Sequence, residues 1–215
     1  MTAIFVEITT SLDGYVAGPN ATLEEPLGAD GERIHEWLVG LASFRELHGG
    51  TGGEVNTDSD LLEQSFRRSG AVVMGRRMFS GGAGPWEDDP NAKGWWGDDP
   101  PFRKPVFVLT SHPREPLELG RTTFTFVTDG VDAALEQART AAGDKDVQIA
   151  GGANVVQQVL EAGYADELNI HVAPLLLGGG VRLFDGGTRT SVPLECVSVV
   201  DSPKAVHLKY RVIRN

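Results

Sequence analysis

The chain has 215 residues, 40% of them hydrophobic, and its 30 acidic side chains outnumber 19 basic ones, which gives a formal net charge of -11. This length and composition predict one domain with a sizeable core, and the acidic excess argues against a protein that coats nucleic acid or an anionic membrane. A single cysteine, Cys196, excludes an internal disulfide framework, and the lack of zinc-spaced thiols, of a leader and of a bilayer-spanning segment predicts a cytoplasmic protein without a metal site.

Hydrophobic periodicity and turn residues divide the first half of the chain into elements. The pattern predicts a strand over 4–10, a helix over 30–47, a helix that begins at 58–60, a buried strand over 71–75 and a short helix from 76. The first strand ends at an Asp-Gly turn formed by Asp13 and Gly14. The second helix begins at Asp58, Ser59 and Asp60, whose short oxygen-bearing side chains are suited to cap free amides at the positive end of a helix.

The segment over 81–101 is rich in Gly, Pro and Asp, and it also carries Trp86, Trp95 and Trp96. A loop of this length in a compact domain is usually functional or disordered, and the tryptophans favour a loop that packs on something. Two interpretations follow: the loop closes over a ligand cleft, or it is a mobile insertion that contacts a partner chain.

The second half of the chain alternates strands with helices. The pattern predicts strands over 104–111, 123–128 and 146–150, helices over 131–143 and from 153, and final strands over 168–174, 195–202 and 205–213. Such alternation predicts a largely parallel sheet with helices on both faces, and the short links between the last strands predict antiparallel pairing there. Cys196 lies in one of these last strands, where we expect a small buried apolar residue.

One predicted strand end carries two adjacent glycines, Gly151 and Gly152, followed by Ala153 and Asn154. Ligands of open α/β sheets gather beyond the carboxyl ends of the parallel strands. Because glycines lack a Cβ atom, a phosphate can approach the backbone N–H groups at the start of the next helix, where the helix dipole also favours an anion. The alternative is a tight turn between strand and helix, since the residues match neither a P-loop nor a GxGxxG motif.

Two further strand ends carry residues suited to phosphate. Arg76 and Arg77 follow Gly75 directly after a buried strand, and two guanidiniums in so acidic a chain suit the 2′-phosphate of an adenine dinucleotide. The alternative for them is a solvated helix start paired with nearby acids. Thr110 and Ser111 follow the next strand and are suited either to share that phosphate or to cap a turn. Together the three strand ends predict a dinucleotide site.

Four stretches give the sequence a family resemblance: SLDGYVAG (11–18), VVMGRRMF (72–79), KPVFVLTS (104–111) and IAGGANVVQQVLEAGYADELNIHVAPLLLGGGVRLF (149–184). Their order resembles the dihydrofolate-reductase-like superfamily and, within it, the reductase domain at the carboxyl terminus of the riboflavin-biosynthesis deaminase-reductase. The resemblance implies a three-layer α/β/α fold whose mixed, mainly parallel sheet has about eight strands, the C-terminal ones antiparallel. It also implies a single reductase domain over 1–215 with loop insertions at about 48–57 and 81–103, NADPH as the cofactor, and a homodimer.

The resemblance also implies roles for individual residues. It assigns the cofactor pyrophosphate to Gly151, Gly152, Ala153 and Asn154, the phosphate at the adenosine end to Gly75, Arg76 and Arg77, and the adenosine side to Thr110 and Ser111.

Three carboxyl groups are candidate donors of the proton that a substrate needs in addition to the hydride. Asp13 belongs to a family signature, and its alternative role is an Asp-Gly turn with local hydrogen bonds. Glu7 lies in a strand that we expect to be central; if it opens on the cleft, burial raises its pKa and makes it a proton donor. Glu36 lies on the helix that flanks the pterin in dihydrofolate reductases.

The sequence also departs from this family. Glu7 stands where the riboflavin-pathway reductase carries a lysine, GRRMFSGG (75–82) replaces a Gly-x-x-Thr-Val run, and the Leu-Pro-Trp segment of true dihydrofolate reductases is missing. The leading hypothesis is an NADPH-dependent reductase of a small heterocyclic substrate, resembling 5-amino-6-(5-phosphoribosylamino)uracil reductase of riboflavin biosynthesis. The alternatives are a dihydrofolate reductase proper and a non-catalytic nucleotide-binding module.

Overall fold

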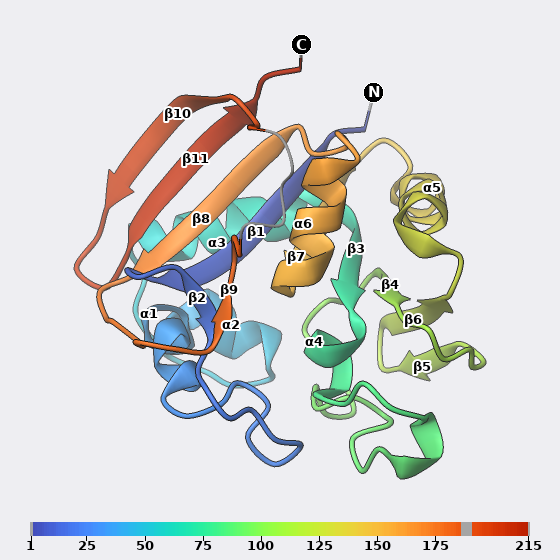
Figure 1. Ribbon diagram of the computed structural model, residues 1–215. Coiled ribbons are helices and arrows are strands. Elements are labelled where there is room, and N and C mark those ends of the chain that lie inside the picture. Colours follow the sequence, from blue (N-terminus) through green and yellow to red (C-terminus); the bar gives the residue numbers. More distant parts are fainter. Residues whose placement is uncertain (1, 186–190, 215) are drawn as a thin grey trace.

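A mixed nine-stranded sheet runs through the computed structural model, which describes residues 2–185 and 191–214 (Figure 1). The strand order is β10-β11-β8-β1-β7-β3-β4-β6-β5, and β2 pairs with β9 in a separate two-stranded sheet. In chain order the strands are β1 (Ile4–Ser11), β2 (Tyr15–Ala17), β3 (Ser69–Gly75), β4 (Pro105–Leu109), β5 (Leu117–Leu119), β6 (Thr122–Val127), β7 (Asp146–Gly151), β8 (Glu167–Ala173), β9 (Val181–Arg182), β10 (Leu194–Asp201) and β11 (Val206–Val212).

The pairing of the strands confirms the predicted fold class. Strands β8, β1, β7, β3, β4 and β6 run parallel, whereas β11, β10 and the short β5 pair antiparallel. The large sheet has nine strands rather than about eight, because the three-residue strand β5 lies on one edge. Its alternating pattern is too short to read from the sequence.

Helices cover both faces of the sheet, as Figure 1 shows. They are η1 (Gly31–His35), α1 (Glu36–Val39), α2 (Ala42–Leu47), α3 (Thr57–Arg68), α4 (Arg76–Ser80), η2 (Trp86–Asp88), α5 (Gly130–Ala142) and α6 (Ala153–Glu161). Helices α5 and α6 lie on one face, where they close the largest hydrophobic core. Helices α1 to α3 lie on the opposite face. No helix within the described ranges is long and apolar enough to cross a membrane.

The predicted helix over 30–47 is wrong as a single element. It divides into η1, α1 and α2, because Leu41 leaves the helix in an extended conformation and forms a β-bridge with Glu54. The start predicted for the next helix also shifts. Asn56, not Asp58, is its N-cap, and the Asn56 side chain accepts hydrogen bonds from the backbone N–H groups of Asp58 and Ser59. The Asp58 carboxylate is therefore free to make another contact.

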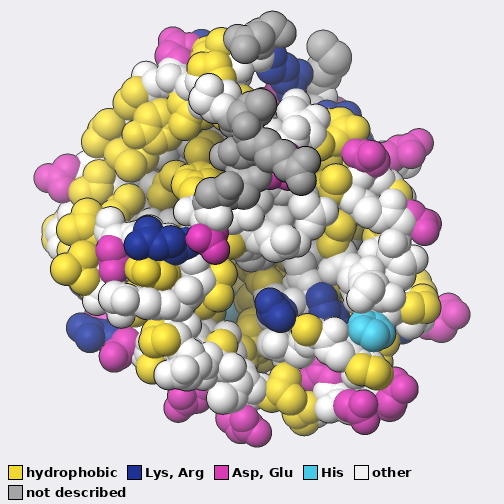
Figure 2. Space-filling model, viewed as in Figure 1, with side chains coloured by type: hydrophobic (Ala, Val, Ile, Leu, Met, Phe, Trp, Pro, Cys, Tyr) yellow, Lys and Arg dark blue, Asp and Glu magenta, His cyan; other side chains and the backbone are white. Residues whose placement is uncertain are grey.

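The expected burial of Cys196 is also wrong, because the structure exposes this residue. Cys196 lies on β10, which is the edge strand of the sheet and is exposed along nearly its whole length. Apolar side chains gather over β10 and β11 in the upper left of Figure 2. Among them, Leu194, Val197 and Val199 are exposed.

Candidate active site

The three predicted phosphate-binding strand ends lie next to one another. Strands β7, β3 and β4 are neighbours in the parallel part of the sheet, so their carboxyl ends meet at one edge. In the register, Met74 pairs with Gly151 and Gly75 pairs with Leu109, one residue before Thr110. Residues predicted from separate parts of the chain therefore share one site.

The turn between β7 and α6 leaves open space beside backbone amides. Gly151 has a φ of 117°, which side-chain-bearing residues rarely adopt, and the peptide bond to Gly152 is cis. A Cβ atom on Gly152 would meet nothing within 4 Å, whereas one on the facing Gly75 would lie 3.0 Å from Val155. No side chain caps α6, so its first amides remain available to an anion. The turn therefore combines open space at Gly152 with uncapped amides at the start of α6.

The two predicted arginines differ in what they contact. Arg76 is buried, its guanidinium lies 2.6 Å from the Asp89 carboxylate and it stacks on the Trp86 ring at 3.5 Å from the centroid. Its charge is therefore already balanced inside the protein. Arg77 is exposed, and it lies in the first turn of α4, which begins directly after β3.

The remaining predicted cofactor residues lie at the same edge. The Thr110 hydroxyl accepts a hydrogen bond from the backbone N–H of His112 at 3.1 Å, which is the capped turn expected as an alternative, and Ser111 is exposed. Ala153 packs its side chain in the core, while the Asn154 side chain is exposed and accepts a hydrogen bond from Gln158 at 2.6 Å.

A cavity of about 830 Å³ opens on the face of the sheet that carries α1 to α3. Its floor includes Glu7 and Thr9 of β1 and Gln148 and Ala150 of β7. Aromatic side chains form much of its wall: Trp37, Phe44, Phe66, Trp95, Trp96 and Phe102. Ala150, which lines the cavity, directly precedes Gly151 in the chain. The size of the cavity is in the usual range for small-molecule and cofactor sites.

The tryptophan loop takes part in this cavity. Trp95 and Trp96 line it, and the Asn91 side chain donates a hydrogen bond to the Leu23 carbonyl at 2.9 Å, which ties the loop to the segment after β2. Trp86 points away toward the sheet, where its Nε1–H donates to the His112 carbonyl at 2.8 Å. The tryptophan loop therefore covers the cavity of its own chain.

The ionisable groups of the cavity wall supply little free positive charge. Lys104 donates to the Phe66 and Ser69 carbonyls and the Ser69 hydroxyl, and burial lowers its pKa to about 8. Burial also lowers the pKa of His35 to about 4, so this imidazole is neutral at pH 7. The acids on the wall are Glu7, Glu24 and Glu32.

Of the three predicted catalytic carboxylates, Glu7 lines the cavity and the other two lie elsewhere. Asp13 accepts hydrogen bonds from the Leu177 and Gly178 amides at 3.1 and 2.8 Å, and thereby joins the end of β1 to the loop after β8. The Glu36 side chain is 68% exposed and lies 3.6 Å from Arg33.

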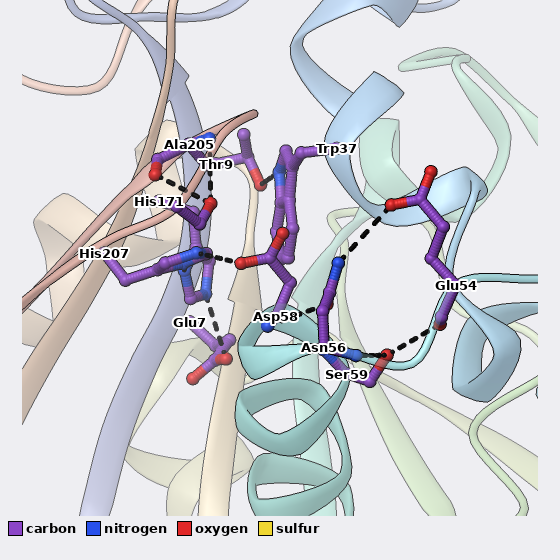
Figure 3. A network of polar contacts seen from close by, with 11 residues as sticks. Glu7, Thr9, Trp37, Glu54, Asn56, Asp58, Ser59, His171, Ala205 and His207 are labelled. Atoms are coloured by element: carbon purple, nitrogen blue, oxygen red, sulfur yellow. Dashed lines mark hydrogen bonds and ion pairs between the residues drawn. The ribbon is translucent and has the colours of Figure 1, made fainter.

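Glu7 is the first member of a chain of polar contacts that reaches α3 (Figure 3). Its Oε1 lies 3.0 Å from His171 Nε2, and Asn169 donates to its Oε2 at 3.0 Å. His171 Nδ1 lies 2.7 Å from His207 Nδ1, and His207 Nε2 lies 3.0 Å from Asp58 Oδ1.

The indole of Trp37 encloses this chain of contacts. Its ring centroid lies 4.9 Å from that of His171 and 5.1 Å from that of His207, and its Nε1–H donates to Thr9 at 3.3 Å. The two imidazoles are therefore packed from the side that faces α1.

The expected rise in the pKa of Glu7 is wrong. Burial does act to raise it, but hydrogen bonds from His171 and Asn169 and the positive charge of His171 together lower the pKa of this carboxyl below its usual value. For His207, burial and the charge of His171 lower the pKa, and Asp58 and Glu7 oppose them only in part. Glu7 is therefore held as a carboxylate in the resting protein.

His171, His207 and the contact between Asp58 and His207 were not predicted from the sequence. The two histidines pair directly across β8 and β11, but these strands are more than 30 residues apart in the sequence. One signal for this contact was available: each of two apolar strands that were expected to pair antiparallel carries a histidine. Within the described residues, no cluster of His, Cys, Asp and Glu is arranged to hold a metal ion.

Comparisons with known proteins concern the family and the fold. The family model described as the RibD C-terminal domain matches residues 2–208. A search of curated proteins gave no match.

Solved structures share the fold. A protein from Shewanella sp. PV-4 that is assigned to riboflavin biosynthesis is 24% identical with a TM-score of 0.65, and each chain is covered to 100%. A pyrimidine reductase-like protein from Corynebacterium diphtheriae is 18% identical with a TM-score of 0.58, over 100% of this chain and 93% of that one. Dihydrofolate reductase from Enterococcus faecalis, complexed with NADP(H), is 17% identical with a TM-score of 0.51, over 98% and 96%.

Proposed function

Since the chain belongs to the RibD C-terminal domain family, we propose that it is an NADPH-dependent reductase of a small heterocyclic substrate, similar to the pyrimidine reductases of riboflavin biosynthesis. One observation carries this proposal: the open glycine turn at Gly151 and Gly152 directly follows Ala150, the residue by which β7 reaches the aromatic cavity. An anion-binding turn beside a cavity for planar rings suits a dinucleotide whose reactive end enters the cavity.

The residues around the turn divide the work of holding the cofactor. The amides of Gly152, Ala153 and Asn154 hold the pyrophosphate, because they begin α6 and no side chain competes for them. Arg77 holds the phosphate at the adenosine end, with Thr110 and Ser111 beside it. Gly75 permits close packing against the turn, and Arg76 supports the site from within through Asp89 and Trp86. A bound dihydronicotinamide supplies a hydride.

The cavity wall indicates the kind of substrate. Aromatic side chains favour a planar ring that stacks on them. The wall carries Glu7, Glu24 and Glu32, and its one lysine already donates to three oxygen atoms. A second phosphate group would therefore meet more negative than free positive charge. We propose that the ring binds without a charged phosphate in this cavity.

The test has two stages. NADPH and NADH are titrated into the protein while tryptophan emission and melting temperature are recorded, and we expect NADPH to bind more tightly. Loss of nicotinamide absorbance is then followed with 5-amino-6-ribosylaminouracil, with its 5′-phosphate and with dihydrofolate. Turnover of the unphosphorylated pyrimidine supports the proposal. Tight methotrexate binding with dihydrofolate turnover would indicate a dihydrofolate reductase, and binding of NADPH without any turnover would indicate a nucleotide-binding module.

We also propose that the protein is a homodimer that pairs through β10. This edge strand exposes Leu194, Val197 and Val199, and apolar side chains cover the sheet beside it (Figure 2). Long, exposed apolar edges invite association with another chain. Light scattering should give twice the chain mass of 23.0 kDa, and Val199→Lys should return the protein to the monomer mass.

A further inference from the structure

The chain of contacts from Glu7 to Asp58 places four ionisable groups in series on four elements: β1, β8, β11 and α3. The heavy-atom separations are 3.0 Å, 2.7 Å and 3.0 Å from Glu7 through His171 and His207 to Asp58. Each is a hydrogen-bond distance. All four side chains are largely buried, so bulk water does not compete for these contacts.

The number of protons in this series follows from its geometry. Three contacts between ring nitrogens and their partners need three protons, because a hydrogen bond holds one proton between its two heavy atoms. Two neutral imidazoles carry only two. With both carboxylates ionised, the third contact forms only if one imidazole is an imidazolium. The three short contacts are thus all hydrogen bonds only when the His171–His207 pair shares one extra proton, which would lie between two carboxylates.

The series also separates two cavities. Glu7, Ser65 and His171 line both the 830 Å³ cavity and a second one of about 410 Å³ between α3 and the β8–β11 side of the sheet. His207 and Lys209 line only the second cavity. The buried Ser65 hydroxyl also lies at the shared wall, where it acts with His171 and Asn169 to lower the pKa of the Glu7 carboxyl. The pair of histidines thus connects the proposed substrate cavity to a space on the other side of the wall.

We propose that Glu7, His171, His207 and Asp58 form a proton relay that supplies the substrate cavity with the proton consumed in reduction. This inference rests on the proposed function, because reduction of a C=N or C=O bond adds a hydride to carbon and needs one proton at nitrogen or oxygen. Glu7 is the catalytic residue, since it faces the cavity. His171, His207 and Asp58 act through it.

The protons balance as follows. As the substrate heteroatom gains an electron pair, His171 Nε2 gives its proton to the Glu7 carboxylate, and Glu7 passes that proton to the heteroatom and becomes a carboxylate again. His171 Nδ1 takes the shared proton from His207 Nδ1, so the series ends with one proton fewer and both imidazoles neutral. Water in the second cavity returns that proton to His207 or His171, which both line it. No electrons pass through the relay.

Other titratable groups face the relay from both cavities without forming an ion pair with it in the described part of the chain. On the second cavity, Arg68 of α3 lies 2.5 Å from Glu167, and Lys209 of β11 lies 3.0 Å from the same carboxylate. Across the first cavity stand Glu24, Glu32, His35, His48 and Lys104. None of these lies within ion-pair distance of the four relay groups in the described part of the chain.

The decisive variant is Asp58→Asn, matched with Asp60→Asn as a control. Both changes remove one carboxylate from the first turn of α3, but Asp60 is exposed and only Asp58 contacts His207. Loss of the Asp58 charge destabilises the shared imidazolium, so the alkaline limb of the pH profile of the hydride-transfer rate should move about 1 to 3 pH units lower. Asp60→Asn should leave the profile unchanged.

A second measurement uses the resting protein and needs no substrate. Nitrogen-15 NMR of the histidine rings at pH 7 should show one shared imidazolium in the His171–His207 pair, with a strongly deshielded Nδ1 proton, and Asp58→Asn should lower the pH at which it is lost. Two neutral imidazoles, or equal pH profiles for the Asp58 and Asp60 variants of an active enzyme, would overturn the relay. Failure of NADPH to bind, by contrast, would overturn the proposed function and leave the NMR result intact.

Discussion

Gly152→Ala tests the proposed pyrophosphate site without disturbing the fold. The new methyl group would lie in open space, with no heavy atom within 4 Å, and the backbone at this residue is extended at φ −70° and ψ −167°. The folded structure therefore accommodates alanine, and the melting temperature should stay equal or rise slightly, because alanine restricts the unfolded chain. The same methyl group would occupy the space through which a phosphate reaches the first amides of α6.

The expected loss of NADPH affinity follows from the hydrogen bonds at stake. A hydrogen bond to a charged group contributes about 1.5–3 kcal/mol, so displacement of the phosphate from one amide should weaken binding by roughly 10-fold to 150-fold. Fluorescence titration gives the dissociation constant, and Gly84→Ala is the matched control. Gly84 also has open space around it but lies in the exposed loop before Trp86. Unchanged affinity in Gly152→Ala, with NADPH bound by the parent protein, would refute the proposed turn.

Three further outcomes distinguish the roles of neighbouring groups. Arg77→Ala should narrow the preference for NADPH over NADH while the melting temperature stays unchanged, because Arg77 is exposed; an unaltered preference would count against its phosphate contact. Arg76→Ala should instead lower stability by about 3–5 kcal/mol in a denaturant titration, because it leaves Asp89 buried and unpaired. Burial lowers the pKa of His35 from 6.5 to about 4 in the folded protein. Between pH 6.5 and about pH 4, this residue therefore binds more protons in the unfolded chain than in the folded protein. Stability should therefore fall as pH drops from 6.5 to about 4, and His35→Phe should lose that part of the pH dependence, which urea titrations at several pH values would detect.

The shared position of the proposed cofactor-binding residues at one edge of the sheet was predictable, because the signals for it are local. Gly151 and Gly152 stand between a strand and a helix in the sequence, and the order of strands in a parallel sheet brings Gly75 and Thr110 to the same edge. Pattern and topology rules are enough for such an arrangement. The same rules gave the fold class and most of its strands.

The interior of the substrate side was not predictable, because it depends on register and on distant partners. His171 meets His207 only because β8 and β11 pair in one particular register. A single sequence does not predict that register with single-residue precision. Arg76 finds Asp89 across a loop whose path has no periodicity. Asp58 was interpreted as a helix cap, but Asn56 has that role, and this leaves the Asp58 carboxylate to His207.

The positions of the four tryptophans give each half of the site its own optical reporter. Trp86 lies between the guanidiniums of Arg76 and Arg114, at 3.5 and 4.6 Å, and its indole N–H is bonded to the turn after Thr110. Trp37, Trp95 and Trp96 line the cavity instead. Variants that keep only one of these indoles would resolve the arrival of an adenosine group at the strand edge from the arrival of a ring in the cavity. The order in which coenzyme and substrate enter would then be readable from emission alone.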